Sequence, residues 1–216
     1  MKAFVSWSGG KESVLSFYRT RQNPEVEIAY FLSMVSEDGQ RSRSHGINSD
    51  LMQKQALMAG VPLIRQRCSW TTYEAEFKKA ILSLKEKGVE AGIFGDIDLQ
   101  EHRDWVEKIC KEMEIKPILP LWQEARKTLL EEFTAAGFKA IVVAVQADFL
   151  GNEWLGRIVN EKFITDLQIR KNVDLCGENG EYHTFVFDGP VFQDQVDFSV
   201  GRKVLKENRW FLKLYP

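Results

Sequence analysis

The sequence predicts an α/β fold, in which a doubly wound parallel sheet is followed by a smaller C-terminal α+β domain. The first observation is that short apolar strand-like runs alternate with helix-like segments from the N-terminus to about residue 146. The second is that this alternation then stops, because residues 181–215 hold strand-like runs with little helix between them. We therefore expect two domains, residues 1–146 and residues 147–216, which pack closely because no Pro/Ser-rich linker separates them.

The first domain is expected to contain six strands. Each is a short run rich in apolar or β-branched residues. The run at 139–145 (KAIVVAV) is nearly all apolar, which is typical of a strand buried on both faces of a parallel sheet. The predicted strands are 3–7, 27–35, 61–64, 91–97, 117–121 and 139–145.

Helices are expected between these strands. Apolar residues recur at helical spacing after the first strand, and Asn48 or Ser49 can cap a helix that Gly60 closes. Thr71 and Glu74 have the spacing of a capping box, which predicts a helix running toward Gly88. The predicted helices are 12–21, 49–59, 71–87, 101–113 and 123–136. In the second domain, residues 147–175 look helical, and strands are expected at 182–187, 196–200 and 209–215.

Composition and charge exclude several classes of protein. The chain has 216 residues, of which 44% are hydrophobic and 28% charged, so it is neither collagen-like nor disordered. Its formal net charge is −2, which does not indicate a nucleic-acid binder, although a local basic patch stays open. No apolar run approaches the roughly 20 residues that cross a bilayer. The three cysteines lie far apart with no CxxC, which predicts reduced thiols and a cytoplasmic location.

A glycine turn follows the first predicted strand and has the composition of an anion site. In an α/β fold, ligands bind outside the carboxyl ends of the strands. The glycines let backbone N–H groups approach an anion, and a helix N-terminus adds unpaired donors. A plain glycine turn is the alternative, but the neighbouring hydroxyls and the cation favour a phosphate cradle. The turn consists of Ser8, Gly9, Gly10, Lys11, Glu12 and Ser13.

This string, SGGKES, resembles the PP-loop (Ser-Gly-Gly-x-Asp-Ser) of the ATP pyrophosphatases in the adenine nucleotide α-hydrolase superfamily. It is neither a Walker A loop nor a Gly-x-Gly-x-x-Gly turn. The resemblance implies a PP-loop ATP-binding domain, ATP cleavage between the α and β phosphates, and pyrophosphate held by the loop. Glu12 stands where the family pattern has Asp, and the resemblance implies that its carboxylate holds Mg²⁺.

Further segments are similar to one branch, the diphthine–ammonia ligase family. In that family ATP adenylates the carboxylate of diphthine, a modified histidine on elongation factor 2, and ammonia then forms the amide, releasing AMP and pyrophosphate. The resemblance implies the cofactors ATP and Mg²⁺, the partners ammonia and elongation factor 2, and a C-terminal substrate-binding domain. The segments that carry it are 34–36, 44–46, 95–97, 102–103, 120–122, 147–157 and 176–190.

The same resemblance implies roles for individual residues. Beyond the loop itself, it implies nucleotide contacts at Ser36, His45 and Gly95. It implies substrate contacts at Asp96, His102, Arg103, Trp154, Arg157, Asn179, Gly180 and Thr184. It implies catalytic roles for Glu178, Glu181 and His183.

Several of these residues have ordinary structural interpretations beside the functional ones. Glu178 and Glu181 can bind Mg²⁺ or accept a proton from ammonia, or they can form a solvated acidic turn. Asp96 can be a helix cap, and the 36–46 loop can either close over the nucleotide or be mobile. Trp154 can simply pack on an amphipathic helix. A persulfide role for Cys176 is disfavoured because no partner cysteine lies nearby in the sequence.

One departure from the family pattern bears on the substrate. The ligase motif usually reads Glu-Gly-Gly-Glu-(aromatic)-Glu-Thr, and here Asn179 replaces a Gly and His183 replaces a Glu. Exchanging an anion for an imidazole can change the bound molecule. The alternatives are therefore a ligase for another small carboxylic acid, a tRNA-modifying PP-loop enzyme, and a non-catalytic ATP-binding protein. The strand-rich C-terminus also suggests a homodimer.

Overall fold

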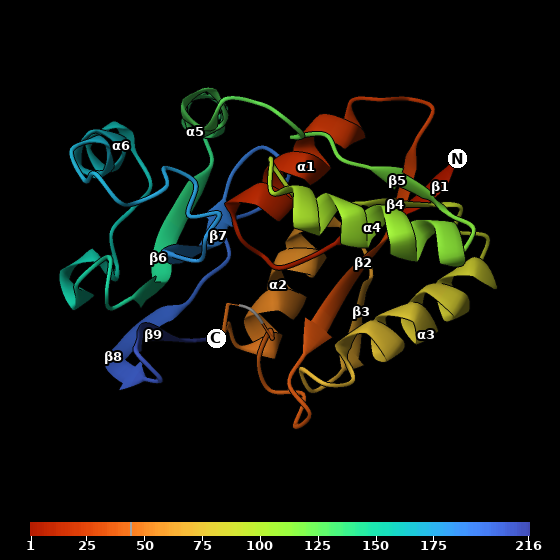
Figure 1. The fold of residues 1–216 in the computed structure, drawn as a ribbon, viewed down its shortest axis with the longest axis horizontal. Helices are drawn as coiled ribbons and strands as arrows, with labels where there is room; N and C mark the ends of the chain where they lie inside the picture. Colours follow the sequence, from red (N-terminus) through yellow and green to blue (C-terminus); the bar gives the residue numbers. More distant parts are fainter. Residues whose placement is uncertain (44) are drawn as a thin grey trace.

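A computed structural model describes residues 1–43 and 45–216, and these residues form two sheets with helices around them (Figure 1). The first sheet has five parallel strands in the order β3-β2-β1-β4-β5. Its strands are β1 (Lys2–Ser6), β2 (Glu27–Val35), β3 (Leu63–Arg67), β4 (Ala91–Ile93) and β5 (Lys116–Ile118). The predicted α/β class with a parallel sheet is confirmed.

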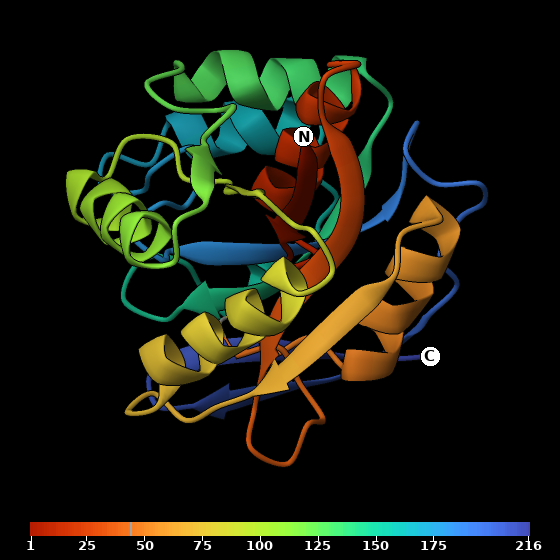
Figure 2. The ribbon, with the colours of Figure 1, turned by 90° about the vertical axis from the view of Figure 1, so that its right-hand side faces the viewer.

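Helices cover both faces of this sheet, as a doubly wound fold requires. The helices are α1 (Lys11–Arg21), α2 (Ser49–Ala59), α3 (Tyr73–Lys85), α4 (Gln100–Glu112) and α5 (Arg126–Ala135). Side chains alternate along β1, so Phe4 packs with α3 and α4 while Val5 packs with α1 and α2. Figure 2 shows α2 and α3 on opposite sides of β3.

The order of the strands reverses at β1, because β2 lies on one side of it and β4 on the other. Such a reversal is the point where open α/β sheets bind ligands, at the carboxyl ends of the strands. The turn between β1 and α1 lies at this point. The topology therefore places the predicted phosphate cradle where a ligand site is expected.

The second sheet is antiparallel and has the order β7-β6-β9-β8. Its strands are β6 (Lys139–Gln146), β7 (Tyr182–Asp188), β8 (Ser199–Lys206) and β9 (Arg209–Tyr215). The prediction that 139–145 belongs to the parallel sheet is wrong, because β6 pairs antiparallel with β7 and β9. An apolar run indicates only that both faces of a strand are buried, and β6 is buried on both faces in the antiparallel sheet as well.

The segment 147–175 is less helical than expected. It holds a short 3₁₀ turn (Asn152–Trp154) and the helix α6 (Glu161–Gln168). Gly156 interrupts it with φ +88°, a conformation that side chains disfavour. The capping box at Thr71 is also absent: Thr72 is the residue that precedes α3, and the Thr71 hydroxyl hydrogen-bonds that of Ser69 at 2.8 Å.

One hydrophobic core joins the two sheets. It includes Val5 of β1, Leu51 of α2, Val142 of β6 and Phe185 of β7. The division at residue 146 stays a prediction, and by hydrogen bonding β6 belongs to the C-terminal sheet. None of the helices in the described residues is long and apolar enough to span a membrane.

Candidate functional site at the glycine loop

The glycine loop is held on one side by a buried glutamine. Gln55 of α2 is fully buried and donates to the Gly9 carbonyl at 3.0 Å and to the Val186 carbonyl at 2.6 Å. Its own carbonyl accepts from the indole of Trp7 at 3.2 Å. Gly9 has φ +76°, and a Cβ there would lie 2.4 Å from the Gln55 amide oxygen. Only glycine fits this position of the loop.

Strand β7 holds the loop on the other side. The backbone N–H of Lys11 donates to the Thr184 hydroxyl at 3.1 Å, and the N–H of Val186 donates to the Gly9 carbonyl at 3.0 Å. The C-terminal sheet therefore helps to fix the geometry of the N-terminal loop. The predicted loop residues and Thr184 are brought together.

The two loop serines lie within the cradle itself. The hydroxyl of Ser8 lies 3.1 Å from that of Ser13, and Ser13 donates to the Gly10 carbonyl at 3.0 Å. Gly10 precedes α1 and provides no side-chain cap for it. Thr184 already occupies the N–H of Lys11, but Gly10 caps none of the first turn of α1, so the N–H groups of Glu12 and Ser13 that follow can meet an anion.

Lys11 points into the protein. Its side chain is buried, donates to the Cys176 carbonyl at 2.5 Å, and lies 4.2 Å from the centre of the Tyr182 ring. Burial alone would lower the pKa of its amine, but Glu12, 2.6 Å away, and the acidic groups around it raise that pKa overall. Lys11 is thus a permanent cation beneath the loop that ties it to the 174–181 segment.

Carboxylates gather next to the loop. Burial raises the pKa of Glu178 to about 7, and the negative charges of Glu12 and Asp96 add to this shift. The backbone of Ile97 offsets a small part of this rise in the pKa. Within the described residues, no group of three His, Cys, Asp or Glu side chains has the arrangement of a complete metal site. Mg²⁺ commonly uses one or two carboxylates together with phosphate oxygens, so the pair Glu12 and Glu178 is compatible with it.

The segment after β4 packs against the start of α1, next to the glycine loop. A Cβ on Gly95 would lie 3.1 Å from the backbone of Glu12, so glycine is needed where β4 passes the start of α1. Asp96 accepts from His102 at 3.1 Å, and this bond raises the pKa of His102. Arg103 pairs with Glu107 at 2.6 Å on α4. His102 is brought near the carboxylates, whereas Arg103 is engaged on its own helix.

Glu181 holds the 174–181 segment in shape. Its buried carboxylate accepts from the backbone N–H of Asp174 at 2.9 Å and from that of Asn179 at 3.0 Å. The Asn179 side chain donates to it at 3.2 Å. Gly180 turns the segment with φ +82°. These contacts are structural, and a catalytic role for Glu181 stays a prediction.

Two histidine rings lie against each other beside the loop, tilted by 60°. The rings of His45 and His183 lie 4.4 Å apart, and a Cβ on Gly10 would be 3.0 Å from the His45 Nε2. Burial, Lys11 and Arg209 lower the pKa of His45 to about 3. Burial, the other histidine and the same cations lower that of His183 as well. Arg209 of β9 donates to His183 Nε2 at 2.5 Å, so His183 is neutral with its proton on Nδ1.

Some predicted residues lie in structural contacts away from the loop. Trp154 is buried against Phe163, with ring centres 5.6 Å apart, and Arg157 pairs with Asp166 at 2.5 Å. Ser36 donates to Asp38 at 2.5 Å in the turn after β2. Ser44, part of the predicted 44–46 turn, lies outside the described residues. Roles for these residues in binding stay predictions.

Sequence analysis missed Gln55 and Arg209. Gln55 follows helical spacing on the buried face of α2, so a polar residue on an apolar stripe was the available signal. Arg209 lies on a strand and is recognised only once β9 pairs with β6. Burial raises the pKa of the Cys176 thiol, which gives no support to a reactive thiolate.

Comparison with known proteins decides the family. Residues 1–117 match the family described as the diphthamide synthase N-terminal domain, and residues 125–215 match the diphthamide synthase C-terminal domain. The chain belongs to the diphthamide synthase family. This confirms the resemblance to PP-loop ligases that the motifs indicated.

Several relatives are named diphthine–ammonia ligase. The rat protein is 30% identical, over 95% of this chain and 85% of the rat protein. The mouse protein is 31% identical over 64% of this chain and 53% of its own length, and the budding yeast protein is 26% identical over 89% of this chain but 34% of its own length. The alignment thus spans about half or less of some relatives. A solved chain from Methanocaldococcus jannaschii, described as a predicted subunit of tRNA methyltransferase, aligns over 66% of this chain and 80% of its own length with a TM-score of 0.44 and 17% identity.

The family matches agree with the position of the site. The first match ends at residue 117 and the second begins at residue 125, ahead of β6. The glycine loop lies in the first match and the 176–184 segment lies in the second. The site of this diphthamide synthase family member is thus formed where the two matched parts meet.

Proposed function

We propose that this chain is an ATP-dependent carboxylate–ammonia ligase of the diphthine–ammonia ligase type. In this reaction the diphthine carboxylate attacks the α-phosphate of ATP, giving an acyl-adenylate and pyrophosphate. Ammonia then attacks the acyl carbon, and AMP leaves. The family membership and the names of the relatives support this assignment.

The single observation that carries the proposal is the fixed glycine loop at the reversal of the sheet. Gln55 and Thr184 hold Gly9 and Lys11 from opposite sides, so the loop is formed before any ligand arrives. Preorganised N–H donors stabilise the charge that develops on departing pyrophosphate without having to reorganise. The 176–184 segment, which would meet the acid, lies directly against this loop.

Glu12 and Glu178 fit a magnesium ion together with ATP phosphates. Glu178 is a partly buried carboxylate whose pKa is raised partly by the negative charge of Glu12, and a divalent cation would relieve that repulsion. When bound, Mg²⁺ would neutralise charge on the phosphates. Glu12 is the better candidate to hold it, because it lies in the first turn of α1, within the glycine loop.

Glu178 is suited to accept the proton that ammonia loses on attack. A general base works best with a pKa near the working pH, and the pKa of Glu178 is about 7. Glu181 is less suited, because three donors already occupy its carboxylate. His183 is better suited to orient the acid than to take a proton, since burial and Arg209 keep its pKa low.

A ligase for a different carboxylic acid is the second candidate. The observation that favours it is the contact between His183 and Arg209, at the position where the ligase motif has a Glu. This contact creates a neutral imidazole backed by a cation, which suits an anionic group on the acid. The comparisons give no support to tRNA modification.

The remaining assignments follow from this proposal. Ammonia would arrive free or from a partner protein, elongation factor 2 would be the partner that carries diphthine, and the location would be the cytoplasm. A homodimer through the C-terminal sheet is compatible with β8 being an edge strand.

The test is a product assay. The chain is incubated with MgATP, ammonium chloride and elongation factor 2 that carries diphthine. We expect AMP to form together with the amide, identified by mass spectrometry of the modified histidine peptide. AMP without the amide would instead indicate adenylation of another acid or simple hydrolysis.

A further inference from the structure

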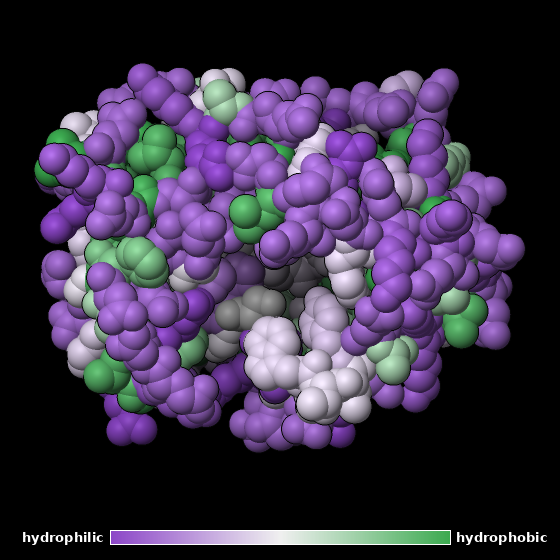
Figure 3. Space-filling view, in the orientation of Figure 1, coloured by the Kyte–Doolittle hydropathy of each residue, from purple (hydrophilic) through white to green (hydrophobic). Residues whose placement is uncertain are grey.

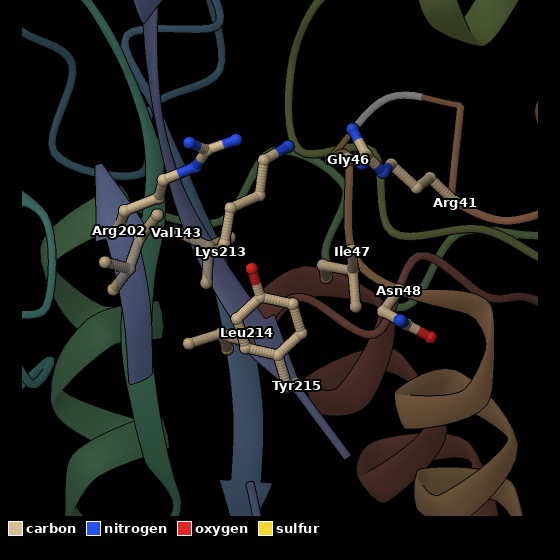
Figure 4. Close-up of a pocket in the computed structure, with 10 residues that line it drawn as sticks. Arg41, Gly46, Ile47, Asn48, Val143, Arg202, Lys213, Leu214 and Tyr215 are labelled. Carbon is tan, nitrogen blue, oxygen red and sulfur yellow. The ribbon is translucent and has the colours of Figure 1, made fainter. Parts of the chain in front are cut away.

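A positively charged groove runs beside the glycine loop, between the turn after β2 and the β8–β9 hairpin. Two adjoining cavities of about 120 and 530 Å³ form it, and both are lined by Arg41, Gly46, Arg202 and Lys213. Arg43 and Lys206 line the larger one. Together these five cations define the basic groove. Figure 3 shows one hydrophilic face of the molecule hollowed near its centre, and Figure 4 shows Arg41, Arg202 and Lys213 reaching toward the same space.

The hairpin places its cations on one face through strand alternation. Val204 pairs with Phe211 across β8 and β9, so Lys206 and Lys213 project on the same side of the hairpin as this pair. Arg202 lines the same cavities. Lys203, one residue away, projects to the opposite side and donates to the Asn152 carbonyl at 2.7 Å.

The positive charge of the groove is not neutralised by the protein. Among residues 1–43 and 45–216, only one of these five cations forms an ion pair, which is Lys206 with Glu207 at 3.3 Å. The groove contains one carboxylate, Asp38, which is hydrogen-bonded by Ser36 and the backbone of Gln40. Burial and the charges of Arg41, Arg202 and Lys206 lower the pKa of Lys213, so these like charges are close enough to repel one another.

Like charges held together without counter-ions favour an anionic ligand, because only the ligand relieves their repulsion. Arginine forks suit phosphate and carboxylate oxygens. The larger cavity, of about 530 Å³, exceeds what a single small ion needs and falls in the size range of sites for small molecules. The net charge of −2 makes this local cluster a specific feature of the groove.

The groove begins next to the loop. His45, whose ring meets Gly10, directly precedes Gly46, which lines both cavities and packs against Phe211. Arg209, which contacts His183, lies on the same strand two residues before Phe211. A ligand in the groove would therefore lie beside the nucleotide site without occupying the glycine loop.

We propose that the basic groove binds a small polyanion, a molecule with two or more phosphate or carboxylate groups, through Arg41, Arg202 and Lys213. This site is additional to the glycine loop and does not depend on the proposed ligase reaction. Phosphate and carboxylate share the chemistry that these side chains recognise.

The test is calorimetric titration of the full chain at low salt with inorganic tripolyphosphate and with citrate. We expect at least one probe to bind, with tighter tripolyphosphate binding indicating a phosphate ligand and tighter citrate binding indicating a carboxylate ligand. Lys213→Gln should weaken this binding about tenfold, corresponding to the loss of one charged hydrogen bond. The matched control Lys203→Gln removes the same charge from the opposite side of the hairpin and should leave binding unchanged.

Two further variants keep the test decisive. Arg202→Gln, at an exposed position, should weaken binding even if Lys213→Gln impairs folding. Gly10→Val should leave groove binding intact while ATP binding is lost, which separates this site from the loop. The proposal is overturned if neither probe binds, if Lys203→Gln weakens binding as much as Lys213→Gln, or if Gly10→Val abolishes it.

Discussion

The hydroxyl of Thr184 accepts a hydrogen bond from the backbone N–H of Lys11 at 3.1 Å, although the two residues are 173 positions apart in the chain. This bond links the first turn of α1 to β7, and so links the two sheets at the point where the glycine loop lies. The geometry of the loop therefore depends on the C-terminal sheet.

Replacing Thr184 tests this link. Thr184→Val keeps the shape but leaves the buried Lys11 N–H without its acceptor, so we expect a loss of about 1–3 kcal/mol in the free energy of unfolding and weaker ATP binding. Thr184→Ser keeps the hydroxyl and should behave nearly like the parent. Urea unfolding and ATP titration measure both effects. Equal behaviour of the valine and serine variants would mean that the bond does not matter.

Gln55 should be the most sensitive residue of α2. Gln55→Leu leaves the buried Trp7 indole N–H without its acceptor and removes one donor each from the Gly9 and Val186 carbonyls, which should cost about 1–3 kcal/mol of stability. Gln53→Leu is the matched control, because Gln53 is exposed on the same helix. Denaturant midpoints of the two variants give the comparison. Similar midpoints would show that Gln55 does not hold the loop.

The three histidines should separate in an NMR titration. The bond to Asp96 raises the pKa of His102, so its ring should titrate above the usual value of about 6.5. Burial and nearby cations lower the pKa of His45 to about 3 and lower that of His183 well below its usual value, so both rings should stay neutral where His102 titrates. Two flat ring signals and one titrating signal are expected, and three ordinary titration curves would contradict the buried pair.

Glu178 should make the protein less stable as the pH rises. Because its pKa is raised from 4.5 to about 7 in the folded state, the folded protein binds more protons than the unfolded chain between these values. Its ionisation therefore costs stability progressively across this window, up to roughly 3 kcal/mol above pH 7. In metal-free buffer, Glu178→Gln should be more stable than the parent at pH 8 and similar to it at pH 4.5, as measured by urea unfolding. A variant destabilised at both pH values would refute the assignment.

The same substitution should slow the proposed amide formation, since it removes the group suited to accept the proton from ammonia. Greater stability with lower activity would identify Glu178 as a site residue rather than a packing residue. Glu181→Gln should instead lower stability at pH 8, because its carboxylate holds three donors.

Local patterns were enough to predict most of the elements. Strand β2 and helix α2 lie where the apolar runs and the caps at Asn48 and Gly60 placed them, because those signals are local. The partner of β6 could not be predicted, since an apolar strand is buried equally well in a parallel or an antiparallel sheet. The helix expected over 147–175 shrank to α6, because Gly156 and the bridge between Ile141 and Ile158 shape this segment instead.

The site residues, too, could be predicted where the signal was local and not where it depended on distant segments. The glycine loop and Thr184 were found from short motifs, whereas Gln55, Arg209 and the basic groove arise from pairing between distant segments. The sequence shows several cations within a short C-terminal stretch, at Arg202, Lys206, Arg209 and Lys213. That they line a groove could not be predicted, because the groove forms only where the turn after β2 faces the β8–β9 hairpin in the fold.

The measurement that tests the central claim most directly is ATP–pyrophosphate exchange with Mg²⁺ and diphthine-bearing elongation factor 2. Gly10→Val should abolish exchange, because a side chain there meets His45 and the Thr184 carbonyl at the loop. Gly151→Val is the matched control, since an added Cβ there meets only the side chain of Glu153. We predict exchange that requires the factor in the parent and in Gly151→Val. Absence of exchange in a protein that binds ATP would contradict diphthine as the acid.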